Sequence, residues 1–149
     1  MQGGGSTITQ QYVKNYFLTQ DRTIDRKLRE MIIAIKIDRD LSKDQILEGY
    51  LNTIYYGRGA YGIQAAAKAY FNKDASALNV SEGAVLASVM NAPSLFDPAL
   101  GEKQKTNLAN RWTYVMDGMV SMGALSAACL LYTSPSPRDR TRSRMPSSA

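Results

Sequence analysis

The sequence contains no histidine and one cysteine, Cys129, and both scarcities exclude classes of chemistry. A Cys-His nucleophile, a metal centre built from clustered ligands and an internal disulfide are excluded. Ser6 has no histidine to activate it, so it is a poor nucleophile. No apolar run approaches the roughly 20 residues that span a bilayer, and the start does not resemble a signal peptide. The remaining chemistry must come from carboxylates, cations and amides.

Positive charge is concentrated at the end of the chain, although 44% hydrophobic residues are enough for one globular domain of 149 residues. The formal net charge is +5, and residues 130–149 hold four arginines and one aspartate, a net +3 that leaves +2 for the rest. This Ser-, Pro- and Arg-rich end lacks any helical or strand period. We therefore predict a domain over residues 1–128 and a disordered, non-native tail over 129–149. A basic tail that binds an acidic surface, or a linker, is the alternative.

The spacing of apolar residues predicts an all-α fold without strands. We expect helices over residues 7–18, 24–39, 63–71, 81–90 and 102–122, and another that begins with a capping box from Ser42 to Gln45. The first should carry Ile8, Tyr12 and Tyr16 on one apolar face, with Val13 and Phe17 beside them. The second should bury a regular stripe of Ile24, Leu28, Met31, Ile32 and Ile35. The last should bury Leu108, Trp112, Val115, Met116 and Met119.

Chemically useful residues are densest between Gly3 and Glu30. Three glycines precede Ser6, a candidate N-cap for a helix whose first N–H groups would suit an anion. A flexible leader before an ordinary helix is the alternative. Polar candidates follow at Gln10, Gln11, Lys14, Arg22, Arg26, Lys27 and Glu30. Ile33 and Ile37 continue the Glu30 side of the second helix, so we expect Glu30 to line a cleft.

An ordinary surface ion pair between Arg26 and Glu30 is the alternative for this group. The functional interpretation is more specific, because Lys14, Arg22 and Lys27 can hold phosphates. Gln10 and Gln11 can bond sugar hydroxyls or amides. The combination suits a sugar-diphosphate substrate with a charged leaving group.

Four ordered sequence motifs are specific to one family. Residues 4–11 read GGSTITQQ, Arg26, Lys27 and Glu30 form R-K-x-x-E, residues 43–52 read KDQILEGYLN, and Arg111 precedes Val115 and Met116. They resemble the second to fifth signature motifs of the peptidoglycan glycosyltransferases, glycosyltransferase family 51. These form the transglycosylase domain of class A penicillin-binding proteins and of monofunctional relatives. The resemblance covers roughly residues 1–127.

The resemblance implies a lysozyme-like helical domain that is incomplete here. It implies polymerisation of lipid II into β-1,4 glycan strands with inversion and release of undecaprenyl diphosphate. The partners would be lipid II, the nascent glycan chain and, in the full-length parent, the membrane surface, with no nucleic acid. The location would be the outer face of the bacterial cytoplasmic membrane. No cofactor is implied beyond a divalent cation that could accompany the substrate diphosphate.

Site residues follow from the same resemblance. Glu30 would be an essential carboxylate that orients the cations or the substrate. Arg111 would pair structurally with a helix of the site, Asn52 would be structural, and Glu48 would be either a structural brace or a direct catalytic group. The implied substrate-binding residues are Ser6, Gln10, Gln11, Lys14, Arg22, Arg26 and Lys27. Tyr55, Tyr56 and Tyr61 would either pack a glycine-rich turn or stack on sugars.

One departure from the family concerns its first motif, Glu-Asp-x-x-Phe-x-x-His, which supplies the general base. The sequence has no histidine and therefore no such motif. We expect a fragment truncated at both ends that has no polymerising activity by itself. A lysozyme-like hydrolase and a non-catalytic helical module that binds nucleic acid remain alternative functions. The second alternative predicts steep salt dependence that truncation at Leu130 would abolish.

Overall fold

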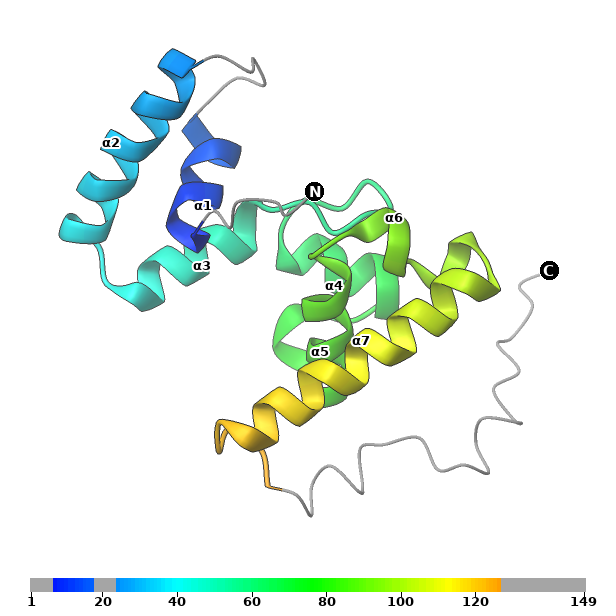
Figure 1. Cartoon of the computed structure of the whole chain (residues 1–149). Helices are drawn as coiled ribbons and strands as arrows, with labels where there is room; N and C mark the ends of the chain where they lie inside the picture. Colours follow the sequence, from blue (N-terminus) through cyan, green and yellow to red (C-terminus); the bar gives the residue numbers. More distant parts are fainter. Residues whose placement is uncertain (1–6, 18–23, 127–149) are drawn as a thin grey trace. The chain divides into compact units, whose positions relative to one another are not determined.

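The structure, a computed structural model, describes residues 7–17 and 24–126 (Figure 1). These residues are helical and contain no β-strand, only an isolated antiparallel bridge between Tyr55 and Tyr61, which confirms the predicted all-α class. The α-helices are α1 (Ile8–Phe17), α2 (Ile24–Asp40), α3 (Lys43–Thr53), α4 (Ile63–Phe71), α5 (Val80–Val89), α6 (Pro93–Phe96) and α7 (Glu102–Ser121). Two 3-10 turns, η1 (Ala75–Ala77) and η2 (Pro98–Leu100), complete the order. Within this part of the chain, no helix has both the length and the apolarity needed to cross a bilayer.

The chain forms two compact units, Met1–Ala77 and Leu78–Ala149. In the first, α1 packs against both α2 and α3, and α3 contacts α4. Figure 1 shows α1 and α2 side by side and running in opposite directions. The buried centre of this unit includes Val13, Ala34, Ile46 and Tyr50, so α1 is the element that the other two helices enclose.

The apolar stripe of α2 is exposed, and the prediction that it forms core is wrong. The exposed fractions are 83% for Ile24, 54% for Leu28, 44% for Met31, 61% for Ile32 and 67% for Ile35. The face that lies against α1 instead buries Glu30 and Ala34, which are 2% and 5% exposed. Periodicity identifies an apolar face, but it does not say which neighbour covers it.

The start of α1 also differs from the prediction. Thr7 takes the capping position predicted for Ser6: its Oγ1 accepts from Gln10 N at 3.2 Å, and its N–H donates to Gln10 Oε1 at 3.3 Å. Ile8 and Tyr16, at the two ends of the predicted apolar face, are 46% and 62% exposed. Val13 and Thr9 occupy the buried face, because α2 approaches on that side.

Two further helix starts show reciprocal capping. Ser42 and Gln45 form the predicted capping box of α3. In α5 the cap is Asn79, two residues before the predicted start: its side chain accepts from Glu82 N at 2.9 Å, and Glu82 Oε2 accepts from Asn79 N at 3.0 Å. Each box satisfies two backbone donors that would otherwise lack partners.

The second unit is built around α7, which contacts α5, α6 and η2. Trp112 and Met116 form its core with Ala84 of α5, and Val115 and Met119 pack against them. Trp112 also donates its indole N–H to the carbonyl of Ser81 at 3.1 Å. The predicted core face of this helix is therefore confirmed for Trp112, Val115, Met116 and Met119.

The glycine-rich turn after α3 is sharply bent, with positive φ at Gly57, Arg58 and Gly59. Tyr56 is fully buried there, as packing of the turn predicts. Tyr55 and Tyr61 lie on the surface, 43% and 68% exposed, with ring centroids 4.9 Å apart.

Candidate functional site

Glu30 is the buried carboxylate of α2, and Lys27 is its cation. Lys27 Nζ lies 2.5 Å from Glu30 Oε1, one helical turn away, and the Lys27 side chain is 46% exposed. A buried carboxylate is costly unless it is paired and hydrogen bonded. The pair therefore keeps an ammonium group at the solvent edge of α2. Glu30 does not lie on an open solvent face, whereas the predicted cleft beside it stays a prediction.

The two glutamines of α1 have partners within the protein. Gln10 closes the capping box with Thr7. Gln11, which is half-buried, accepts at Oε1 a hydrogen bond of 3.0 Å from the Tyr50 hydroxyl of α3. Lys14 is exposed on the same helix. These bonds fix the backbone and one amide of the predicted substrate-binding stretch.

Three predicted site residues cannot be placed by their side chains. Ser6 and Arg22 lie outside the described residues, and only the backbone of Arg26 is described, within α2. The site assignments therefore stay predictions. Among the described side chains, the structure directly joins Lys27 to Glu30 and Gln11 to α3.

Sequence analysis missed a polar link between α1 and α2. Thr9 Oγ1 donates to Asp38 Oδ1 at 2.8 Å, and Thr9 is 7% exposed. The partners are 29 positions apart, so no local spacing connects them. Thr9 lies four positions before Val13 and therefore on the same helix face. A hydroxyl residue at this spacing from an apolar one is the sequence feature that could have indicated a buried Thr9.

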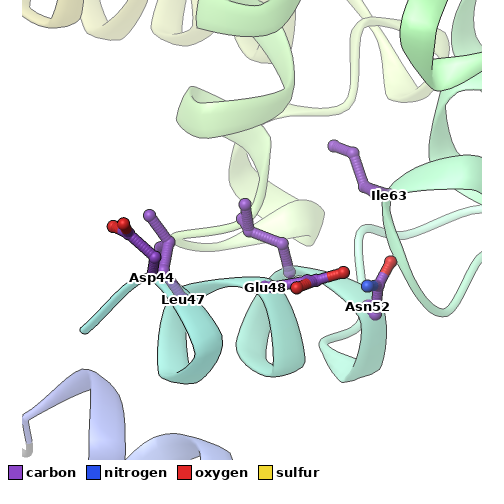
Figure 2. Close-up of a pocket in the computed structure, with 6 residues that line it drawn as sticks. Asp44, Leu47, Glu48, Asn52 and Ile63 are labelled. Atoms are coloured by element: carbon purple, nitrogen blue, oxygen red, sulfur yellow. The ribbon is translucent and has the colours of Figure 1, made fainter. Parts of the chain in front are cut away.

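A separate hollow of about 270 Å³ lies along α3. Its lining consists of Asp44, Leu47, Glu48, Leu51, Asn52 and Ile63. Figure 2 shows Glu48 and Asn52 following one another along α3, with Ile63 across from them. Glu48 and Asn52 thus share a mostly apolar hollow whose lining includes no residue of α1 or α2. Both predicted roles of Glu48, a structural brace or a direct catalytic group, stay predictions.

Arg111 belongs to α7 in the second unit and is half-buried. Its guanidinium carbon lies 4.9 Å from the ring centroid of Tyr114, a cation–π contact. Its Nε is buried without a hydrogen-bond partner among the described residues. The arrangement gives Arg111 a packing contact within its own helix, and the predicted pairing of Arg111 with a helix of the site stays a prediction.

Burial also changes the acid–base behaviour of two tyrosines in the first unit. It raises the pKa of Tyr50 above the usual value for a phenol. Burial also raises the pKa of Tyr56, and repulsion by a negative charge on Tyr50 would raise that pKa as well. Tyr50 therefore stays protonated at neutral pH, when it donates to Gln11.

Comparison with known proteins decides the family. A family model described as transglycosylase matches residues 1–120. The chain belongs to the transglycosylase family. This transglycosylase chain is 51% identical over 129 residues to penicillin-binding protein 1A of Mycolicibacterium smegmatis, covering 84% of the chain and 16% of that relative. It is 61% identical over 97 residues to penicillin-binding protein 1F of Bacillus subtilis, covering 65% and 14%.

The fold comparison agrees with the family. A crystal structure of penicillin-binding protein 1A from Haemophilus influenzae matches with a TM-score of 0.54 at 22% identity. The match covers 87% of the transglycosylase chain and 16% of that protein, and at this identity it shows the fold alone. The chain thus spans only 14–16% of the length of these relatives. The predicted family and fold class are confirmed.

Proposed function

We propose that the chain carries the donor-binding part of a peptidoglycan glycosyltransferase that polymerises lipid II into β-1,4 glycan strands and releases undecaprenyl diphosphate. One observation carries the proposal: buried Glu30 holds the Lys27 ammonium at the solvent edge, within an R-K-x-x-E motif. Membership of the transglycosylase family supports it.

The chemistry of the transfer explains why such a cation is useful. An acceptor hydroxyl oxygen bonds to the anomeric carbon as the bond from that carbon to the diphosphate oxygen breaks, and the hydroxyl proton passes to a base. Negative charge grows on the departing diphosphate. A cation already fixed in place stabilises this charge without reorganisation. Glu30, which is engaged with Lys27, fits the role of orienting group better than that of general base.

The substrates and location belong to the same proposal. Lipid II and a nascent glycan chain would meet the site at the outer face of the cytoplasmic membrane, and a divalent cation would accompany the diphosphate. The relatives named penicillin-binding proteins support a cell-wall role.

Binding of a lipid II analogue to the 149-residue chain tests the proposal. We expect Lys27→Ala to weaken binding about tenfold or more, since it removes one charge-assisted contact. Glu30→Gln should also weaken binding, because Lys27 would lose its fixed position. Lys36→Ala is the matched control, an exposed lysine of α2 beyond the Glu30 pair. Equal binding by all variants would refute the proposed role of Lys27. Repeating the titration with a chelator tests the divalent cation.

A further inference from the structure

The solvent side of α2 carries a narrow apolar stripe. Its four members, all exposed, are Ile24, Leu28, Met31 and Ile35. Ile32, which is also exposed, borders the stripe. The opposite face of α2 lies against α1 and buries Glu30 and Ala34. Apolar side chains that gather on one exposed helix face indicate an interaction surface, whereas single exposed ones need no explanation.

The spacing of the stripe is that of a coiled-coil seam. Its members follow one another at intervals of four, three and four residues, as the a and d positions of a heptad do. Such a seam packs against a seam of the same kind on a second helix. Because α2 has 17 residues, it is about 25 Å long, and an antiparallel second copy would match the whole seam. The most apolar register sets Ile24 opposite Ile35. The same register sets Leu28 opposite Met31.

Charges at one edge of the stripe favour the antiparallel arrangement. Asp25 lies in the first turn of α2, and Lys36 follows about three turns later on the same edge. In the register above, Asp25 lies about 3 Å along the axis from Lys36 of the second copy. Parallel copies would instead place like charges side by side. Arg29, on the same edge, is already paired within its own helix, with Nε 2.9 Å from Asp25 Oδ2. Antiparallel helix dipoles add to this preference.

We propose that α2 is a self-association surface, through which two copies of this chain form an antiparallel dimer with two-fold symmetry. Each contact of the register occurs twice in such a dimer, because the same patch is used by both copies. An interface limited to one helix from each copy is small, so the affinity should be micromolar or weaker. The inference concerns the surface of α2 alone and does not depend on the proposed function.

Sedimentation velocity of the 149-residue chain from about 1 to 300 µM tests the dimer, with a reductant present so that Cys129 cannot link two chains. We expect the mass of one chain at the lowest concentration and a growing fraction of two-chain species above it. Ile35→Lys should weaken association tenfold or more, because it places two charges in the seam. Leu95→Lys is the matched control, since Leu95 is an exposed leucine of the second unit. Circular dichroism checks that each variant keeps its helices, and Leu28→Lys is a second seam variant.

Charge exchange tests the orientation. Asp25→Lys and Lys36→Glu should each weaken association about three- to tenfold, since each creates two like-charged contacts in the symmetric dimer. The double variant should recover the affinity of the unsubstituted chain, because it restores unlike charges at both places. A parallel dimer would show no such recovery.

The proposal is overturned if the chain stays monomeric throughout this range, or if the seam variants dimerise as the unsubstituted chain does. Single charge variants that associate normally would overturn the antiparallel arrangement. Vesicles of phosphatidylcholine provide the remaining comparison. Vesicle binding by a chain that is monomeric in their absence would assign the stripe to a lipid surface and contradict the dimer.

Discussion

Several polar side chains are buried in the first unit, and each has a partner that determines its role. Thr9 is bonded to Asp38, Glu30 to Lys27 and Tyr50 to Gln11. An unpaired buried donor or acceptor costs about 1–3 kcal/mol. Two of these pairs, Thr9–Asp38 and Tyr50–Gln11, join α1 to α2 and to α3 and so limit how these helices can pack. The Lys27–Glu30 pair lies within α2.

At high pH, the buried tyrosines should destabilise the folded chain. The pKa values of Tyr50 and Tyr56 are raised in the folded state above the ordinary value of 10.0. Their contribution to the free energy of unfolding is therefore complete below about pH 10 and is lost as the pH rises toward the folded pKa values, because the unfolded chain ionises first. Urea unfolding at about pH 8 and about pH 11 measures this loss.

The Tyr56→Phe variant should lose less stability over that interval, and its phenolate absorbance titration should lack one late-ionising group. Tyr61→Phe provides the control, since Tyr61 is 68% exposed. The same alkaline loss in Tyr56→Phe and in the unsubstituted chain would contradict the assigned cause.

For α2, the sequence pattern predicts the bounds of the helix but not the face that is buried. The sequence predicts its start at Ile24, and its end at Asp40 lies one residue past the prediction. It also predicts the burial of Glu30, through Ile33 and Ile37. The prediction that the apolar stripe of α2 is buried is wrong. The face that packs on α1 carries Ala34, which is buried, and Asp38, which bonds Thr9 of α1. The spacing of apolar residues within α2 does not specify this contact between two helices. Helix bounds follow from local physics, whereas burial follows from tertiary partners.

The exposed stripe of α2 leads to a prediction about surface and core. Ile32→Lys should leave the free energy of unfolding within about 0.5 kcal/mol, because Ile32 is 61% exposed. Val13→Ala should lower it by about 2 kcal/mol, since Val13 is fully buried. Chemical denaturation measures both. A large loss in Ile32→Lys would show that this stripe is covered in solution, and Ile32→Lys should also reduce binding of a hydrophobic dye.

The N-terminal caps of α3 and α5 should each contribute to the stability of the folded chain. Ser42→Ala and Asn79→Ala should each lower the free energy of unfolding by about 1 kcal/mol, because each removes a side-chain acceptor for an N-terminal N–H. Ser76→Ala, at an exposed serine in η1, is the control. If the capping variants match this control, the caps do not stabilise the protein. Denaturant midpoints at constant slope are the measurement.

For the whole molecule, each of the two compact units has its own core. The single tryptophan of the sequence, Trp112, lies in the core of the second unit, so its fluorescence reports on that unit. The first unit holds the described part of the candidate site, including Gln11, Lys27 and Glu30. The described part of the candidate site and the tryptophan therefore belong to different units.

A core substitution in the second unit should be visible to this probe. Met116 is fully buried, and Met116→Ala should lower the stability reported by Trp112 fluorescence by about 2–5 kcal/mol. Met122→Ala is the matched control, because Met122 is 82% exposed. An unchanged fluorescence transition in Met116→Ala would contradict the assigned core.

The candidate site was predictable in its residue types but not in its connections. The motifs identify Gln11, Lys27 and Glu30, and the Lys27–Glu30 pair follows from helical spacing. The Tyr50–Gln11 bond joins residues 39 positions apart, on α3 and α1. Such a contact depends on how two helices meet, which no local pattern specifies.

Reciprocal capping has a consequence for how this chain can be rearranged. The starts of α3 and α5 are each specified by four consecutive residues, 42–45 and 79–82, which satisfy one another's backbone groups. This information is contained within the segment and needs no distant partner. The boundaries just before Ser42 and Asn79 should therefore be better joints for circular permutation or for recombining relatives than positions inside either helix.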